Sequence, residues 1–196
     1  MSGVTEHAAH EVDMVEHELV ARAQRGDENA FADIAYAIGD RLFTVAHRIL
    51  RDVDLAEDAT QQAIVAIWRQ LPGLRDPARF DAWSYRVLVN ACYAQARSER
   101  RWSPSLHVLD TDHGAGDPQL SVADRDQLER GFRRLPPEQR AVLVLQHYLD
   151  LTLPQIAELL GVPIGTVRSR RHYARRAMRA ALEADARPAL SGSRPS

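Results

Sequence analysis

The sequence predicts an all-α protein made of two small helical domains joined by a flexible linker. Apolar residues recur at intervals of three and four along almost the whole chain, which is the period of a helix with one buried face. No segment shows the alternation of apolar and polar residues that marks a half-buried strand. Residues 103–120 interrupt the helical period and are rich in Ser, Pro, Asp and Gly, which is typical of a linker. A chain of 196 residues is long enough for two small domains.

The first domain is expected over residues 14–102, after an acidic and disordered stretch at 1–13. Gly26 should stop the first helix, and Asp27 should cap the second, whose inner face runs from Ala30 to Ile38. Asp54 resembles another helix cap because an acid, Glu57, follows it at the third position. The helices of this domain are therefore predicted near 14–25, from the Asp27 cap through Ile38, near 40–51, from Asp54 to before Pro72, and near 81–101.

The second domain is expected over residues 121–184, followed by a disordered tail at 185–196. A break at Pro136-Pro137 separates its first two helices. The four helices are predicted near 122–134, from Pro137 to about Tyr148, at 153–160 and at 164–183.

The stretch LTLPQIAELLGVPIGTVRSRRH (151–172) has the spacing of a helix-turn-helix. Thr152 and Gln155 form a capping box at the start of the first helix, and Gly161 stands where the turn requires a positive φ. Val162 and Val167 would complete the small core. The second helix then presents six polar residues at one end, and these are the candidates for duplex DNA contact: Thr166, Arg168, Ser169, Arg171, His172 and Arg175.

Charge is distributed unevenly and supports DNA binding by the second domain. Residues 130–180 carry ten arginines against three acids, although the whole chain has a net charge of −2. Arg168, Arg171, Arg175 and Arg179 share a helix face at three- and four-residue spacing. The alternative is an ordinary helical hairpin with a solvated basic face. The agreement of turn, cap and arginine placement favours the DNA-binding interpretation.

Three stretches together resemble one family in order and spacing. They are AEDATQQAIVAIW (56–68), FDAWSYRVLVNACYAQARSERR (80–101) and LPPEQRAVLVLQHYLDLTLPQIAELLGVPIGTVRSRRHYARR (135–176). The chain resembles the extracytoplasmic-function (ECF) sigma factors of bacterial RNA polymerase over nearly its whole length. The resemblance implies sigma region two in the first domain, sigma region four in the second, and no enzymatic activity.

The resemblance implies that the helix containing Ala56-Glu57-Asp58 docks on a coiled coil of the largest polymerase subunit. The residues at the matching positions are Glu57, Asp58 and Gln61, with Gln62 beside them where the family often has Glu. Acids and amides on an exposed helix face suit an arginine-bearing partner. The acids also favour the positive end of the helix dipole, and one residue can serve both purposes.

The next helix combines aromatic residues with arginine and asparagine, which suits single-stranded DNA. By resemblance it opens and reads the promoter's minus-ten element, and the preceding loop at 71–79 captures a flipped base. The candidates are Arg75, Phe80, Tyr85, Arg86, Asn90 and Arg97. For Trp68 and Trp83 core packing is the favoured alternative. In region four, Arg171 stands where the family often has Leu, so it either reaches DNA or lays its stem along the domain surface.

The resemblance further implies as partners the polymerase core (largest and second-largest subunits), promoter DNA and an anti-sigma factor. A cytoplasmic location at the nucleoid, without membrane insertion, is expected because no signal peptide or bilayer-length apolar run is present. No cofactor or metal is expected, since Asp110, Asp112 and His113 stand alone in the linker and Cys92 is the single cysteine. Two alternatives remain, a helix-turn-helix regulator acting without polymerase and a zinc- or histidine-dependent enzyme.

Overall fold

The computed structural model describes residues 17–102 and 122–186, and every regular element in these ranges is helical. The all-α fold class is therefore confirmed. The chain divides into two compact units, Met1–Gln95 and Ala96–Ser196. The predicted linker at 103–120, the acidic stretch at 1–13 and the tail beyond Ala186 lie outside the described residues.

In the first unit, residues 17–24 are helical, and this helix ends in a turn at Gly26 with a φ of 91°. Asp27 then caps α2 (Glu28–Leu50), and its carboxylate accepts a hydrogen bond of 3.0 Å from the backbone N–H of Ala30. The prediction of two separate helices, one from the Asp27 cap through Ile38 and another at about 40–51, was wrong, because α2 is continuous. Its buried stripe passes from Ile38 to Leu42 without a break. The packing of this stripe outweighs the roughly 1 kcal/mol that Gly39 costs a helix interior relative to alanine.

α3 (Val53–Gln70) begins two residues earlier than predicted. Its cap is Asp52, whose Oδ1 accepts from the backbone N–H of Leu55 at 2.9 Å. Arg51 precedes it in the left-handed region, with a φ of 61°, and this turns the chain so that Asp52 rather than Asp54 faces the free N–H groups. Asp54 lies instead in the first turn, where its charge favours the helix dipole.

Two 3-10 turns connect α3 to α4 (Phe80–Trp102): η1 (Leu71–Gly73) and η2 (Pro77–Arg79). The end of α3 before Pro72 and the extent of the last helix agree with the prediction. Asp76 caps η2 by accepting from the backbone N–H of Ala78 at 3.1 Å.

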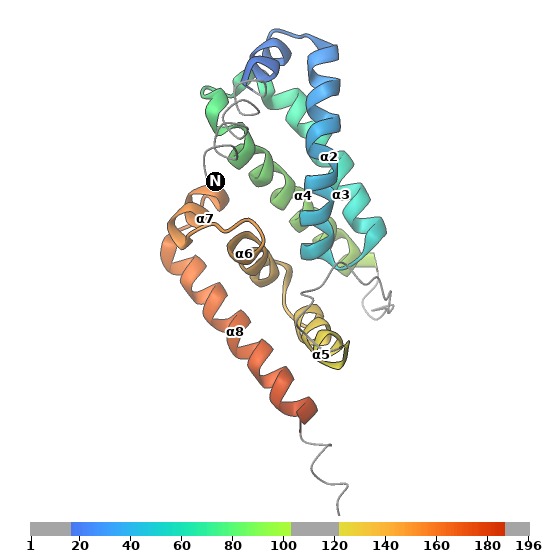
Figure 1. The fold of residues 1–196 in the computed structure, drawn as a ribbon, viewed down its shortest axis with the longest axis vertical. Helices are drawn as coiled ribbons and strands as arrows, with labels where there is room; N and C mark the ends of the chain where they lie inside the picture. The colour runs from blue at the N-terminus through green and yellow to red at the C-terminus, as the bar shows by residue number, and fades with distance from the viewer. Residues whose placement is uncertain (1–16, 103–121, 187–196) are drawn as a thin grey trace, which may run out of the picture. The chain divides into compact units, whose positions relative to one another are not determined.

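The core of the first unit lies where α2 packs along α3 (Figure 1). Leu42 and Ile49 of α2, Ile67 of α3 and Leu88 of α4 are all fully buried. The rings of Phe31 and Trp68 lie 4.7 Å apart between α2 and α3, so Trp68 packs between helices as expected. Other buried side chains in this unit include Leu71, Val89 and Cys92.

In the second unit α8 (Ile164–Ala186) packs against the three helices that precede it (Figure 1). These are α5 (Val122–Arg133), α6 (Pro137–His147) and α7 (Leu153–Leu160). Leu135, Leu143 and Ala174 form a buried cluster, and Phe132 and Met178 pack against it. All four helices lie within two or three residues of their predicted bounds.

None of the helices in the described ranges combines the length and the apolar character that crossing a bilayer requires. In the part of the chain whose side chains the structure describes, no three residues of the His, Cys, Asp or Glu type gather as metal ligands would. Asp110, Asp112 and His113 lie outside these ranges.

Candidate polymerase and nucleic-acid interfaces

The exposed face of α3 carries all four residues predicted to bind polymerase. Glu57, Asp58, Gln61 and Gln62 are exposed, while Ala56, Ala59, Thr60 and Ala63 of the other face are buried. No ion pair joins Glu57 or Asp58 to another residue in the described part of the chain. The two carboxylates are therefore available to a cationic partner.

A surface hollow of about 430 Å³ continues this face toward the end of α3. Gln61 and Gln62 line it together with Val65, Ala66, Arg69 and Gln70. Val65 is 48% exposed, which is unusual for a β-branched apolar residue in the middle of a helix. Val65 was not among the predicted polymerase-binding residues, although its place one turn after Gln61 and Gln62 could have indicated it.

Three of the residues predicted to contact minus-ten DNA form one exposed row on α4. Arg86, Asn90 and Arg97 are exposed, and their spacing of four and seven residues places them on one helix face. Trp83 is half-buried, and its ring lies 6.0 Å from that of Phe80. Trp83 lies three residues before Arg86 and seven before Asn90, so it lies beside the same row. Polar and cationic groups beside an aromatic ring are the elements that bind unpaired bases and their phosphates.

The other three members of the predicted minus-ten set lie in different surroundings. Arg75 is exposed in the loop between η1 and η2, and Tyr85 is half-buried. Phe80 is only 5% exposed, so its ring packs inside the unit and anchors the start of α4. Phe80 is the one member of this set whose side chain the structure places in the core.

The helix-turn-helix has the local geometry that its sequence predicts. Gly161 has a φ of 65° and ends α7, with its N–H bonded to the carbonyl groups of Ala157 and Glu158. At the other end of α7, both the backbone N–H and the hydroxyl of Thr152 donate to Oε1 of Gln155, at 2.8 and 2.7 Å. Val167 is fully buried, which fixes the first turn of α8 against α7.

The predicted duplex-contacting residues follow the outer side of α8. Arg168, Ser169, His172 and Arg175 are exposed, and Thr166 and Arg171 are half-buried. The Ser169 hydroxyl donates to the Thr166 carbonyl at 2.9 Å. Tyr173 is 56% exposed, and its ring lies 5.7 Å from that of His172 in an edge-to-face arrangement. The intermediate exposure of Arg171 agrees with a side chain whose stem lies along the domain and whose charged end reaches solvent.

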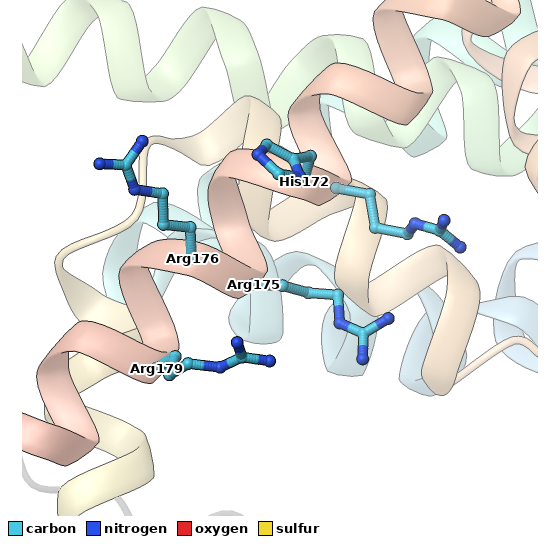
Figure 2. A pocket seen from close by; sticks show the side chains of 5 residues that line it. His172, Arg175, Arg176 and Arg179 are labelled. Carbon is cyan, nitrogen blue, oxygen red and sulfur yellow. The ribbon is translucent and has the colours of Figure 1, made fainter.

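A second hollow, of about 420 Å³, lies farther along α8 (Figure 2). Its lining consists of five basic or imidazole side chains: Arg171, His172, Arg175, Arg176 and Arg179. Arg175 and Arg179 extend to one side of the helix and Arg176 to the other. Arg176 was missing from the predicted site, although it follows His172 by four residues. Among the side chains that the structure describes, no acid forms an ion pair with these arginines.

Such a concentration of like charges destabilises an isolated helix, because arginines four residues apart repel each other. A polyanion neutralises that repulsion, and guanidinium groups bind phosphate in a bidentate manner. The hollow is therefore a suitable place for a phosphate backbone.

Comparisons with known proteins identify two sigma-factor regions in the chain. The family model for Sigma-70 region 2 matches residues 37–102, and the model for Sigma-70, region 4, matches residues 125–178. The chain is 31% identical over 153 residues to the ECF RNA polymerase sigma factor SigM of Mycobacterium tuberculosis, covering 78% of this chain and 77% of SigM. It is 26% identical over 184 residues to the ECF RNA polymerase sigma factor SigW of Bacillus subtilis, covering 87% of this chain and 98% of SigW.

A solved structure, CnrH in complex with the cytosolic domain of CnrY, shows a similar fold. The TM-score is 0.62 at 24% identity, over 87% of this chain and 99% of the CnrH chain. The region 2 match includes α3 and α4, and the region 4 match includes α8 as far as Met178. The chain therefore belongs to the ECF sigma factors, non-enzymatic proteins that direct RNA polymerase to promoters.

Proposed function

We propose that the three surfaces divide the work of promoter-specific initiation between them. The α3 face, from Glu57 to Val65, binds the polymerase core. The row on α4 and the loop at 71–79 contact the melted minus-ten element. The exposed side of α8 reads the minus-thirty-five element, while the arginine-lined hollow holds adjacent phosphates.

The row of Arg86, Asn90 and Arg97 is the observation that supports this division best. A regulator that binds only duplex DNA needs one basic recognition surface, and α8 already provides it. A second exposed row on another helix, α4, with an aromatic ring beside it, fits unpaired bases.

We further propose that the chain works in the bacterial cytoplasm at the nucleoid and is held inactive by a separate anti-sigma protein. CnrH was solved with the cytosolic domain of CnrY, and its fold is similar to that of this chain. An anti-sigma protein would have to cover at least one of the surfaces on α3, α4 or α8 to prevent initiation.

Reconstitution with core RNA polymerase tests the proposal. Run-off transcription of a fragmented genomic library by core enzyme plus this protein, followed by sequencing of the transcripts, should yield a set of start sites with shared minus-thirty-five and minus-ten elements. Permanganate footprinting should then show unpaired thymines at the minus-ten element. Tight, specific binding to duplex promoters by the chain alone, with no effect of core enzyme on transcription, would instead favour the helix-turn-helix regulator.

A further inference from the structure

The side chain of Gln24 joins the first helical segment to the loop that follows α3. Its Nε2 group donates one hydrogen bond to the carbonyl oxygen of Leu74 at 2.6 Å and one to that of Leu71 at 3.2 Å. The two N–H bonds of a single amide are thus directed at two carbonyl groups, 47 and 50 residues away in sequence. Only asparagine and glutamine offer an uncharged terminal NH₂ group of this kind.

Gln24 itself is held in a fixed position. It is the last residue of the helix over 17–24, in which Val20 and Ala23 are buried. The backbone turns sharply after it, with the N–H groups of Arg25 and Gly26 bonded to the carbonyl groups of Arg22 and Ala23 at 3.0 Å. The bidentate pair of Arg22 with Asp27, at 2.9 and 2.7 Å, closes the same turn.

The loop it contacts is anchored on both sides of one exposed arginine. On one side lie the Leu71 and Leu74 carbonyl groups bound by Gln24, and on the other the turn of Asp76 that leads into η2. Arg75 lies between these two anchors and is exposed. The path of the backbone at Leu74 determines the direction in which Arg75 and the loop surface face.

We propose that Gln24 is a positioning residue for minus-ten recognition. It fixes the backbone of Leu71–Leu74, so that the loop at 71–79 already has the shape that binds an unpaired base. This inference rests on the proposed function of that loop. Pre-shaping matters because ordering a loop at the moment of binding costs affinity and selectivity. The short helix before α2 thereby contributes to promoter recognition without contacting DNA.

The fold of the unit depends less on these two hydrogen bonds than the shape of the loop does. The Leu71 side chain is fully buried, and the backbone N–H of Leu74 already bonds to the Leu71 carbonyl at 3.0 Å. Loss of the amide should therefore leave α3 and α4 in place while the loop between them loses its fixed shape.

Two variants test the proposal in the reconstituted holoenzyme. Gln24→Glu keeps the shape but replaces the donor with a carboxylate that repels both carbonyl groups. Gln24→Met keeps the length, brings no charge, and serves if the glutamate variant fails to fold. Asn29→Asp is the matched control, since it makes the same amide-to-carboxylate change at an exposed position five residues away. The readout is fluorescence of 2-aminopurine placed in turn at each non-template position of the minus-ten element, together with open-complex formation on promoters with single-base changes there.

We expect both Gln24 variants to lose about tenfold in discrimination between the preferred base and its alternatives, which corresponds to the loss of one or two hydrogen bonds. Affinity for core enzyme and for a minus-thirty-five duplex should stay at the wild-type value, and Asn29→Asp should behave as wild type. An unchanged discrimination ratio in both variants would overturn the role of Gln24 while leaving the loop's role intact. If the wild-type holoenzyme itself gives no fluorescence rise at any minus-ten position, the loop captures no base and the proposed function of the loop fails with it.

Discussion

The guanidinium of Arg22 donates two hydrogen bonds to Oδ2 of Asp27, while Oδ1 of the same carboxylate caps α2 through the N–H of Ala30. One side chain thus closes the turn after the first helix and starts the second. The hydrogen bond from Ala30 and the pairing with Arg22 lower the pKa of Asp27, and the bond to Asp27 raises the pKa of Arg22.

The first prediction follows from the lowered pKa of Asp27. A carboxyl whose pKa is lower in the folded state stabilises the fold above its unfolded pKa, and that stabilisation is lost as the pH falls through the folded pKa. Asp27→Asn keeps the oxygen that caps Ala30 but removes the charge. The variant should therefore lose less stability than the wild type as the pH falls. Asp27→Ala should lower the melting temperature further, because it also removes the cap. Thermal unfolding followed by circular dichroism between pH 7 and pH 3 would show both effects, and identical acid limbs in wild type and Asp27→Asn would contradict the assignment.

A second prediction concerns the turn of the helix-turn-helix. Gly161 has a φ of 65°, which a residue with a Cβ adopts at a cost of about 1–2 kcal/mol. Gly161→Ala should destabilise the second unit by that amount, and Gly161→Asn should cost less because asparagine tolerates this conformation better. Hydrogen exchange of α7 and α8 amides measures the loss. Equal protection in the alanine variant and the wild type would show that the turn relaxes to another shape.

A third prediction separates base contact from phosphate contact on α8. Arg168→Ala should reduce discrimination between minus-thirty-five sequences, by about 1–3 kcal/mol at the base it contacts. Arg176→Ala and Arg179→Ala should weaken all sequences alike and lower the slope of log affinity against log salt by about one each. Arg134→Ala, an exposed arginine of the same unit outside the hollow, is the control. Holoenzyme binding to promoter fragments at several salt concentrations gives both quantities, and a changed base preference in Arg176→Ala would contradict its proposed role.

A fourth prediction tests the α3 face. Asp58→Arg should lower affinity for core polymerase by about tenfold or more, since a hydrogen bond to a charged group contributes roughly 1.5–3 kcal/mol. Val65→Asp should weaken binding as well, because it replaces an exposed apolar side chain of the hollow with a charged one. Asp40→Arg makes the same charge change at an exposed position on α2 and should bind core normally. Titration of labelled protein with core enzyme provides the affinities, and equal losses for Asp58→Arg and Asp40→Arg would show a general charge effect.

The fifth prediction addresses promoter opening. Asn90→Ala should reduce open-complex formation at the minus-ten element while leaving core binding and minus-thirty-five affinity unchanged. Glu99→Gln, on the opposite side of α4, should open promoters as the wild type does. Stopped-flow measurement of a fluorescent base in the minus-ten element would follow the opening step. Normal opening by Asn90→Ala would remove Asn90 from the proposed contact row.

The sequence predicted the helices where local chemistry determines the outcome. Gly161, Thr152 and Gln155 behave as their residue types indicate, because a positive φ and a free N–H group are requirements of the backbone nearby. The two separate helices predicted before and after Gly39 were wrong, since the buried stripe that carries α2 through this position depends on tertiary packing. The cap at Asp52 was missed because it depends on the left-handed turn at Arg51.

The candidate surfaces also combine features that local sequence predicts with features that depend on tertiary packing. Exposure of Arg86, Asn90 and Arg97 on one face follows from their spacing, which can be read from the chain. The burial of Phe80 does not follow from spacing, because an aromatic residue at a helix start can face either way. The contact of Gln24 with Leu74 joins residues 50 positions apart, and no local pattern indicates it.

The unbroken course of α8 from Ile164 to Ala186 restricts how such a protein can evolve. Arg168 and Arg179 are separated by about 16 Å along one rigid rod, at the helical rise of about 1.5 Å per residue. Inserting or deleting a single residue between them would turn one group by about 100° relative to the other, and only one of the two could then face the duplex. Substitutions can therefore change the DNA contacts of either group separately, whereas changes of length within this helix would be eliminated by selection.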